Sequence, residues 1–288
     1  MQARAYWVQA AGWASVATAM AVLALKLFAW RWTDAASVLA SLLDSGMDLV
    51  SSAINLGALR YASRPADAGH RYGHGKAEAL AAFVQALLLL GSAAAIVYYA
   101  VERARTGVEQ AQPELAAVML MVAGTALAGL LILFQRWVVR RTGSLLVAAD
   151  SLHYRTDFFI NFAVITALLM TSVSAWVDIL AAIGIALYIG GAAFGILRRA
   201  VNELLDAELP AEIDERVLAI ARRHPAVAGA HNLKSRRAGG RSFVQLDLDF
   251  PARIALGEAH AAAAAIREDI QASFPDMDVM LHFDPIGG

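Results

Sequence analysis

The sequence predicts a membrane protein in two parts: an all-α domain of six transmembrane helices, followed by a small cytoplasmic α+β domain. Hydrophobic residues make up 59% of the 288 residues, whereas soluble domains average about 45–50%. Charged residues make up 17%, against about 25% in soluble domains. Residues 198–288 contain no run that could span a bilayer. We therefore expect the transmembrane domain at residues 1–207 and the cytoplasmic domain at residues 208–288.

The six spans are predicted from runs of apolar residues. A helix needs about 20 mostly apolar residues to cross the hydrocarbon core of a bilayer. Five runs are uncharged, and the second run is apolar except for two aspartates. No cleaved signal peptide is expected, because the first run lacks a short apolar region that ends in a clear cleavage site. In chain order the runs are Ala5–Leu25, Ala35–Leu59, Ala79–Val101, Leu115–Gln135, Phe158–Val177 and Ile179–Leu197.

Lysine and arginine residues gather on one side of the predicted spans. Cytoplasmic loops of membrane proteins carry an excess of these residues, so we expect a multi-pass protein with both termini in the cytoplasm. The side assigned to the cytoplasm carries Arg4, Arg60, Arg64, Arg71, Lys76, Arg136, Arg140, Arg141, Arg198 and Arg199, and the other side carries Lys26, Arg31, Arg103 and Arg105.

Two helices and three strands are predicted after the last span. Residues Arg237–Arg241 contain two glycines and predict a hairpin turn. In the strand after this turn, hydrophobic and polar residues alternate, which predicts one buried and one polar face. The order α-β-β-α-β indicates a layered α+β domain. The elements are expected at Glu212–His224, Gly229–Arg236, Ser242–Phe250, Leu256–Phe274 and Asp278–Phe283.

The charge balance and the cysteine count exclude several functions. The chain has 24 lysine and arginine residues and 25 aspartate and glutamate residues. It therefore has no net positive field for phosphates, and no nucleic-acid partner is expected. The chain has no cysteine, which excludes disulfides, thiolate metal sites and cysteine nucleophiles. Any bound metal is therefore expected to be held by histidines and carboxylates.

Two aspartates lie inside the second predicted span. Asp44 and Asp48 are four residues apart, so both project from one face of a helix. An aspartate at the centre of a bilayer costs about 2.5–3.5 kcal/mol on insertion scales, and this span contains no lysine or arginine. The pair therefore predicts a bound cation. The alternative is a pair of protonated carboxyls that form hydrogen bonds between helices.

The fifth predicted helix supplies two further ligands. His153 and Asp157 are also four residues apart and share a helix face at its cytoplasmic end. With the aspartate pair they make a set of four nitrogen and oxygen donors, which suits tetrahedral zinc. Magnesium prefers octahedral oxygen ligands. Asp150 and Arg155 point away from this face, and we interpret them as structural or snorkelling residues.

Three motifs resemble those of the cation diffusion facilitator family, and the resemblance covers nearly the whole chain. The motifs are SLLDSGMD at Ser41–Asp48, GHRYGHGKAE at Gly69–Glu78 and DSLHYRTD at Asp150–Asp157. The resemblance is closest to the bacterial branch of the family. It implies a homodimeric antiporter in the inner membrane, which exports a divalent transition metal against proton entry. It also implies a ferredoxin-like, metal-binding C-terminal domain.

The resemblance implies three metal sites. The transport site would consist of the four membrane residues Asp44, Asp48, His153 and Asp157. The second site would lie in a cytoplasmic loop and consist of Asp67, His70 and His74. The spacing of these three residues suits a metal by itself, and the alternative is a solvated polar loop.

The third site would be a cluster in the tail at the dimer interface. One position departs from the family pattern, because Asp247 stands where close relatives carry a further histidine. An aspartate can still bind zinc, so we expect a site with lower affinity or a changed metal preference. The matching residues of the tail are His231, Asp247, His260, His282 and Asp284.

The sequence therefore predicts a transporter rather than an enzyme, which exports zinc by proton antiport with alternating access. Cadmium, iron(II), cobalt and manganese are further candidate cargoes. A neutral imidazole binds metal, whereas a protonated His153 would repel it. One alternative is a membrane-anchored scaffold that senses metal through its tail, but such an anchor needs no acidic pairs in its spans. Another is an intramembrane metallohydrolase, but a catalytic zinc keeps one position open for water.

Overall fold

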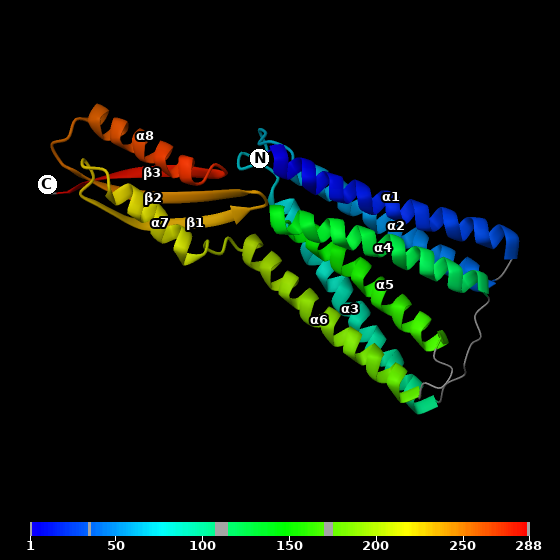
Figure 1. Cartoon of the computed structure of the whole chain (residues 1–288). Helices are drawn as coiled ribbons and strands as arrows, with labels where there is room; N and C mark the ends of the chain where they lie inside the picture. The colour runs from blue at the N-terminus through cyan, green and yellow to red at the C-terminus, as the bar shows by residue number, and fades with distance from the viewer. Residues whose placement is uncertain (1, 34–35, 107–114, 170–174, 287–288) are drawn as a thin grey trace. The chain divides into compact units, whose positions relative to one another are not determined.

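A computed structural model describes residues 2–33, 36–106, 115–169 and 175–286 of the chain (Figure 1). Some side chains within the helices, that of Asp44 among them, lie outside this description. The chain divides into two compact units, Gln2–Ala200 and a second unit that begins at Val201. The domain boundary after residue 207 stays a prediction.

The first unit is built from long helices and contains no strand among its described residues. Four of the helices contain stretches that are long and apolar enough to cross a membrane, in α1, α3, α4 and α6. The helices α2 and α5 carry acidic residues in their interior, and it stays a prediction that they also cross the membrane. The helices are α1 (Gln2–Thr33), α2 (Ala36–Ala62), α3 (Lys76–Thr106), α4 (Leu115–Thr142), α5 (Leu145–Leu169) and α6 (Ala175–Leu204).

The fifth helix begins earlier than the uncharged run indicated. The run begins at Phe158, but α5 starts at Leu145. Its first turns pack inside the unit, because Leu146 and Leu152 are fully buried and Asp150 has buried hydrogen-bond partners. The first turns of α5 contain Asp150, whose carboxylate is hydrogen-bonded inside the protein, and the uncharged run therefore begins after them. The last two predicted spans are separated only by Asp178, but this residue lies inside α6, which begins at Ala175.

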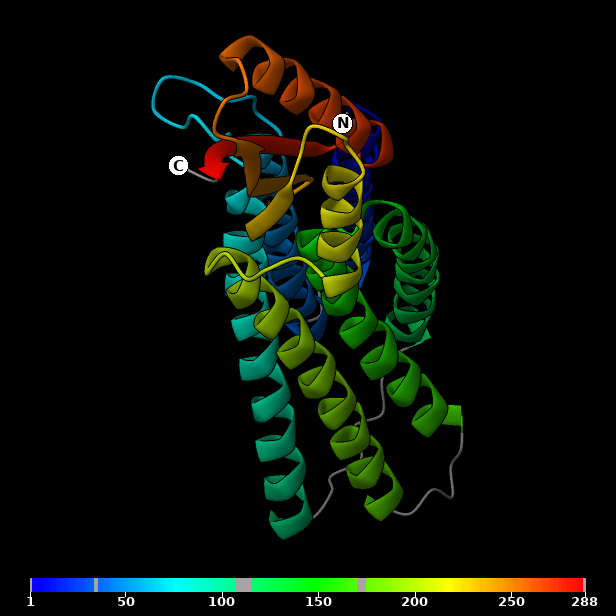
Figure 2. The same cartoon turned by 90° about the vertical axis from the view of Figure 1, so that its left-hand side faces the viewer.

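The helices pack through a core that mixes large and small side chains. α1 packs along α2 and α4, α4 packs along α5, and α3 contacts α2 and α5. α6 runs beside α3 (Figures 1 and 2), and a Cβ atom on Gly190 would lie 3.8 Å from the Cβ atom of Ala93. Small residues at such positions let membrane helices approach closely.

The second unit contains a three-stranded sheet and two helices, in the expected order α-β-β-α-β. The sheet order is β1-β2-β3, with β1 and β2 antiparallel and β2 and β3 parallel. The description of this domain as ferredoxin-like stays a prediction. The elements are α7 (Ala211–Arg222), β1 (Gly229–Ala238), β2 (Arg241–Pro251), α8 (Leu256–Ser273) and β3 (Met277–Ile286).

The two faces of this sheet differ in character. Leu246 and Leu248 of β2 are completely buried, in a core that they share with Val217 of α7 and with Ile266 and Ile270 of α8. The alternation of side chains along a strand sends the residues between them to the opposite face. The cross-strand pairs on that face are His231 with Asp247, Asp247 with His282, Gly229 with Asp249, and Asp249 with Asp284. The polar face therefore collects all the strand residues that the sequence singled out as tail ligands.

Candidate metal centres

The helical unit brings three of the four predicted membrane ligands together. The Nε2 atom of His153 on α5 lies 3.1 Å from Oδ1 of Asp48 on α2 and 3.6 Å from Oδ2 of Asp157. One atom from each of the three residues lies within 4.8 Å of the others, a spacing that a single metal ion can bridge. All three side chains are partly buried. The side chain of the fourth predicted ligand, Asp44, lies outside the described residues.

A buried carboxylate one turn before His153 ties α5 to three other helices. Asp150 is 5% exposed. Its Oδ2 atom accepts hydrogen bonds from Ser15 of α1 and Gln135 of α4, each at 2.6 Å, and its Oδ1 atom accepts one from Asn55 of α2 at 3.0 Å. The carboxylate is therefore surrounded by neutral donors from α1, α2 and α4. Asp150 has a structural position, as the sequence indicated, but it is buried rather than directed toward solvent.

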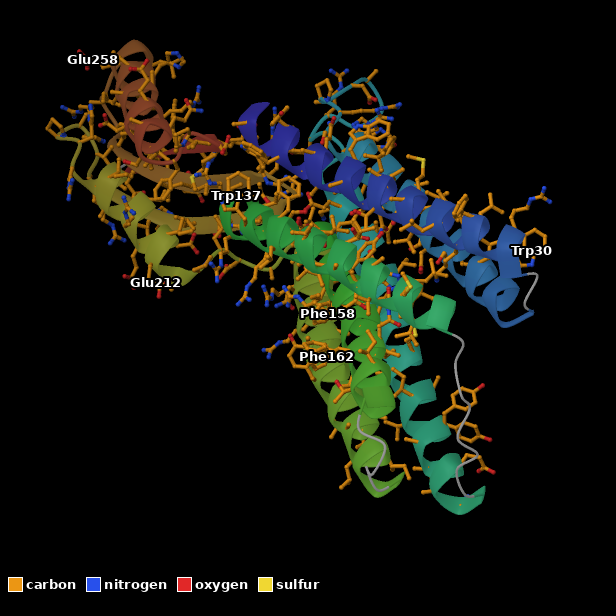
Figure 3. The ribbon with its side chains drawn as sticks, turned by 45° about the vertical axis from the view of Figure 1, so that its right-hand side comes forward. Trp30, Trp137, Phe158, Phe162, Glu212 and Glu258 are labelled. Atoms are coloured by element: carbon orange, nitrogen blue, oxygen red, sulfur yellow. The ribbon has the colours of Figure 1, made fainter. Side chains whose placement is uncertain are left out.

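The residue after His153 fixes the rotation of α5. The hydroxyl of Tyr154 donates to the backbone oxygen of Ser15 at 3.2 Å and hydrogen-bonds with Ser52 of α2 at 3.0 Å. Further along, Phe158 and Phe162 stack on one side of α5 (Figure 3), with ring centroids 6.2 Å apart. The Phe158 ring packs against α4 at Gly129, where a Cβ atom would lie 3.5 Å from the ring, at ordinary contact distance. These contacts hold α5 in the rotation that directs His153 toward Asp48.

The loop between α2 and α3 also forms its predicted cluster. Asp67 faces both histidines: its Oδ1 lies 3.4 Å from Nδ1 of His70, and its Oδ2 lies 3.3 Å from Nε2 of His74. The backbone N–H of His70, which donates to the Asp67 carboxylate at 2.7 Å, is the main cause that lowers the pKa of this carboxyl below its ordinary value. The N–H of Gly69 contributes in the same direction. The carboxylate is thus held in its charged, metal-binding form.

His74 is oriented for binding by the backbone. Its Nδ1 lies 3.2 Å from the carbonyl oxygen of Pro65, and a carbonyl oxygen can only accept, so Nδ1 is the donor. In the neutral ring this leaves the lone pair on Nε2, the atom that faces Asp67. Histidine ligands in metal sites commonly use their second nitrogen in this way. His74 is buried, whereas Asp67 and His70 are exposed.

The tail sheet gathers a cluster that contains three of the five predicted residues and one further aspartate. His231 of β1 lies between two carboxylates, with Nδ1 3.3 Å from Oδ2 of Asp249 and Nε2 3.7 Å from Oδ2 of Asp284. The Nε2 atom of His282 lies 3.3 Å from Oδ1 of Asp284. Sequence reasoning missed Asp249. The alternation in β2 places Asp249 on the same face as Asp247, but it does not show which of the two lies beside His231.

Two of the predicted tail ligands lie apart from this group. Asp247 is 8% exposed, and its Oδ2 accepts a hydrogen bond of 2.7 Å from Nδ2 of Asn232. Asn232 reaches it because the β1–β2 register shifts between His231 and Lys234, and Asn232 has a φ of 49°. His260 is exposed on α8 and is not part of the cluster that the described residues of the sheet form.

Two sequence families match consecutive parts of the chain. The family described as the cation efflux transmembrane domain matches residues 12–205. The family described as the cation efflux protein, cytoplasmic domain, matches residues 209–286. The chain belongs to the cation efflux family. Efflux is a transport process, so this membership places the chain among transporters rather than enzymes.

Named members of the cation efflux family are similar over nearly their full length. The cation-efflux pump FieF of Shewanella oneidensis is 42% identical over 282 residues, which cover 98% of this chain and 95% of that protein. FieF of Escherichia coli O1:K1 / APEC is 39% identical over 276 residues, which cover 94% of this chain and 91% of that protein. Among solved structures, the metal-bound C-terminal domain of the CzcD transporter from Thermotoga maritima is 25% identical. The match covers 27% of this chain and 92% of that domain, with a TM-score of 0.26.

Proposed function

We propose that this chain is an antiporter that exports zinc or a similar divalent transition metal from the cytoplasm in exchange for protons. The observation that carries the proposal is the position of the His153 Nε2 atom between Asp48 and Asp157, contributed by two helices of a membrane-type unit. The family and the pumps that resemble the chain support efflux as the direction of transport. The donor chemistry supports zinc, because one imidazole and carboxylates suit a tetrahedral ion.

Proton coupling follows from competition for one atom. Metal binding requires a lone pair on the His153 Nε2 and ionised carboxylates. Without metal, a proton on Nε2 can be donated to Oδ1 of Asp48 at 3.1 Å. Metal and proton therefore exclude one another at this atom. If the site opens to one side at a time, a metal that arrives from the cytoplasm releases a proton, and a proton that enters from outside releases the metal.

We further propose that the chain works as a homodimer in the bacterial inner membrane, with six spans and both termini in the cytoplasm. The support is the excess of lysine and arginine in the loops on the side of the termini, together with the similarity to bacterial pumps. In this orientation the cluster of Asp67, His70 and His74 and the tail cluster both face cytoplasmic metal. Zinc bound in the tail would favour one arrangement of the two protomers, and so it would shift the population of transport states.

Metal flux into vesicles that contain the purified chain tests the transport proposal. Zinc enters vesicles with the wild-type protein and is detected by a dye in the lumen. We expect Asp157→Ala to reduce this flux to the level of empty vesicles. Thr166→Ala in the same helix is the matched control, because the Thr166 hydroxyl bonds only to the backbone of Phe162 among the interactions of the described residues. Wild-type flux in Asp157→Ala would refute the assignment of the site.

A second candidate function is a membrane-anchored metal sensor, in which the tail carries the activity. The tail cluster favours it, since His231, His282 and Asp284 converge without any membrane residue. The same vesicles discriminate the two functions. A sensor binds zinc but moves none across the bilayer, whereas the antiporter loses flux with Asp157→Ala and keeps zinc binding in the tail.

A further inference from the structure

We propose that Asp249 is a positioning residue of the tail zinc site, which fixes the tautomer and orientation of the His231 ring, and that Gly229 provides the space for its carboxylate. The inference rests on the proposed metal binding by the tail. It concerns a residue that neither the sequence motifs nor the family resemblance single out.

The two ring nitrogens of His231 face different carboxylates. Nδ1 faces Asp249 at 3.3 Å, and Nε2 faces Asp284 at 3.7 Å. A neutral imidazole carries one proton, so only one of its nitrogens can bind a metal while the other donates. Asp284 is also approached by Nε2 of His282 at 3.3 Å. Nε2 therefore faces Asp284, which His282 also approaches, whereas Nδ1 faces Asp249. One oxygen of Asp249 and one of Asp284 also lie within 4.8 Å of each other.

Asp249 lies close enough to Nδ1 of His231 to support this residue as a ligand. With the proton on Nδ1, His231 can donate to the Asp249 carboxylate and present the lone pair of Nε2 to a metal. Carboxylates that accept from the second nitrogen of a histidine fix its tautomer and raise its basicity, and their loss commonly costs about 10–100-fold in metal affinity. Asp249 is partly buried, whereas the His231 side chain is half exposed. A free ring on this surface would rotate, and the carboxylate restrains it.

Gly229 gives a second, independent indication that the Asp249 carboxylate is held in one position. Gly229 pairs with Asp249 across the β1–β2 ladder. A Cβ atom on Gly229 would lie 2.3 Å from Oδ2 of Asp249, the oxygen that faces His231. The φ angle of Gly229 is not in the left-handed region, so the backbone does not require glycine there. The contacts give one reason for glycine at position 229, which is the space that the Asp249 carboxylate occupies.

The arrangement also accounts for the altered position in β2. Asp247 stands directly between His231 and His282 in the sheet register. Its carboxylate, however, accepts a hydrogen bond from Asn232, which the irregularity in β1 turns toward it. Asp249 then supplies the interaction that orients the histidine. We therefore expect Asp249 to affect zinc affinity more than Asp247 does.

The first test measures zinc affinity of the full-length chain in detergent. The background variant carries Asp157→Ala and His70→Ala, which disable the membrane and loop clusters. In this background we expect Asp249→Ala to weaken zinc binding by about 10–100-fold. Asp249→Asn, which keeps a neutral acceptor for the Nδ1 proton, should weaken it less. Equal affinities for Asp249→Ala and the background would overturn the inference. Equal losses in both variants would instead make Asp249 a direct ligand.

Gly229→Ala tests the space for the carboxylate without altering any ligand. The new Cβ atom should displace the flexible Asp249 side chain and weaken zinc binding in the same direction as Asp249→Ala. In the double variant the two effects should not add, because both act through one contact. Gly257→Ala is the matched control, since no atom lies within 4 Å of the Cβ atom that it would add. If Gly229→Ala binds zinc as tightly as the background variant does, this part of the inference is refuted.

The second test reads the tautomer directly and needs no metal. The chain has seven histidines, so selective ¹⁵N labelling gives a spectrum simple enough to assign with single His→Gln variants. We expect His231 of the metal-free protein to carry its proton on Nδ1, and Asp249→Ala to remove this preference. A proton on Nε2 in the wild type would overturn the inference. A background variant that binds no zinc would overturn the tail metal site itself, so the two failures are distinguishable.

Discussion

At the scale of single residues, the membrane site depends on one nitrogen atom. His153 is the only histidine in the cluster that the described residues of α2 and α5 form, and its Nε2 faces both carboxylates. The other donors of the set are hard oxygen atoms, which accept many divalent ions. The imidazole therefore has two roles in the proposed antiporter. It favours zinc over harder ions, and it provides the atom where metal and proton compete.

Replacing His153 with aspartate should alter both roles together. His153→Asp leaves an all-oxygen site, so manganese flux should rise relative to zinc flux. The pH at which protons inhibit metal flux should also fall, because a carboxyl is ordinarily more acidic than an imidazolium group. Flux of the two metals measured between pH 5 and pH 8 tests this. A metal profile and a pH profile that both match the wild type would count against the assigned roles.

Asp214 of α7 provides a stability prediction in the tail. Burial is the main cause that raises the pKa of this carboxyl above its ordinary value, and the charge of Glu208 acts in the same direction, while the hydrogen bond from Ser235 opposes them. Because the folded-state pKa is raised, the contribution of this group to stability is greatest below pH 4 and declines as the pH rises through the folded value. The charged form therefore destabilises the tail at neutral pH.

Asp214→Asn should consequently melt at a higher temperature than the wild type at pH 7, by up to a few degrees. The substitution removes the buried charge. It keeps an acceptor for the Ser235 hydroxyl, which in the wild-type protein donates to Asp214 at 3.2 Å. The advantage should shrink as the pH falls through the raised pKa of Asp214, because the wild-type carboxyl then becomes protonated. Thermal unfolding followed by circular dichroism at pH 4 and pH 7 measures it. An equal difference at pH 4 and pH 7 would mean that the charge of Asp214 is not the cause.

At the scale of helices and strands, local spacing predicted the ligand pairs but not the groups that support them. The four-residue spacing of His153 and Asp157 places both on one helix face, and the structure has them 3.6 Å apart. The partners of Asp150 are Ser15, Asn55 and Gln135, which lie on three other helices. No local pattern connects these positions, because their proximity arises only when the helices pack.

In the strands of the tail, local spacing likewise predicted the faces of the sheet but not the contacts between side chains. Alternation along β2 correctly predicted a polar and a buried face, as the completely buried Leu246 and Leu248 show. It could not decide which polar residue would face His231. That choice depends on the register shift after His231, which gives Asn232 the contact with Asp247 and leaves Asp249 beside the histidine. A one-residue irregularity of this kind has no clear sequence signal in β1.

The buried network around Asp150 predicts a large effect of a small change. Asp150→Ala removes an acceptor of three buried donors. The Ser15 hydroxyl can still donate to the backbone oxygen of Ala11, and the Gln135 amide can still donate to Ser15, but the Asn55 amide loses its bond to Asp150. A buried donor that is left unsatisfied costs about 1–3 kcal/mol. We expect the detergent-solubilised protein to lose its fold at a clearly lower temperature and α5 to be less firmly positioned. Asp150→Asn, which retains one carbonyl acceptor, should be affected less. Melting curves of the two variants test this, and an unchanged melting temperature in Asp150→Ala would contradict it.

At the scale of the whole molecule, the proposed antiporter has a membrane site for the cargo and cytoplasmic clusters that would bind the same metal. The helical unit contains Asp48, His153 and Asp157, and the family that matches residues 12–205 is one of cation efflux. The tail carries its own cluster on the open face of a sheet. Each unit therefore has a ligand set of its own, and coupling between them would require zinc to favour one conformational state of the protein.

The most direct test of proton exchange is the pH change that a zinc gradient alone produces. Vesicles with the purified wild-type chain start at equal pH on both sides, with a pH dye in the lumen, and zinc is added outside. If metal and proton compete for His153 Nε2, zinc entry must carry protons out, and the lumen should become alkaline. His153→Ala should abolish this change. Zinc entry without any change of lumen pH in the wild type would contradict the antiport mechanism.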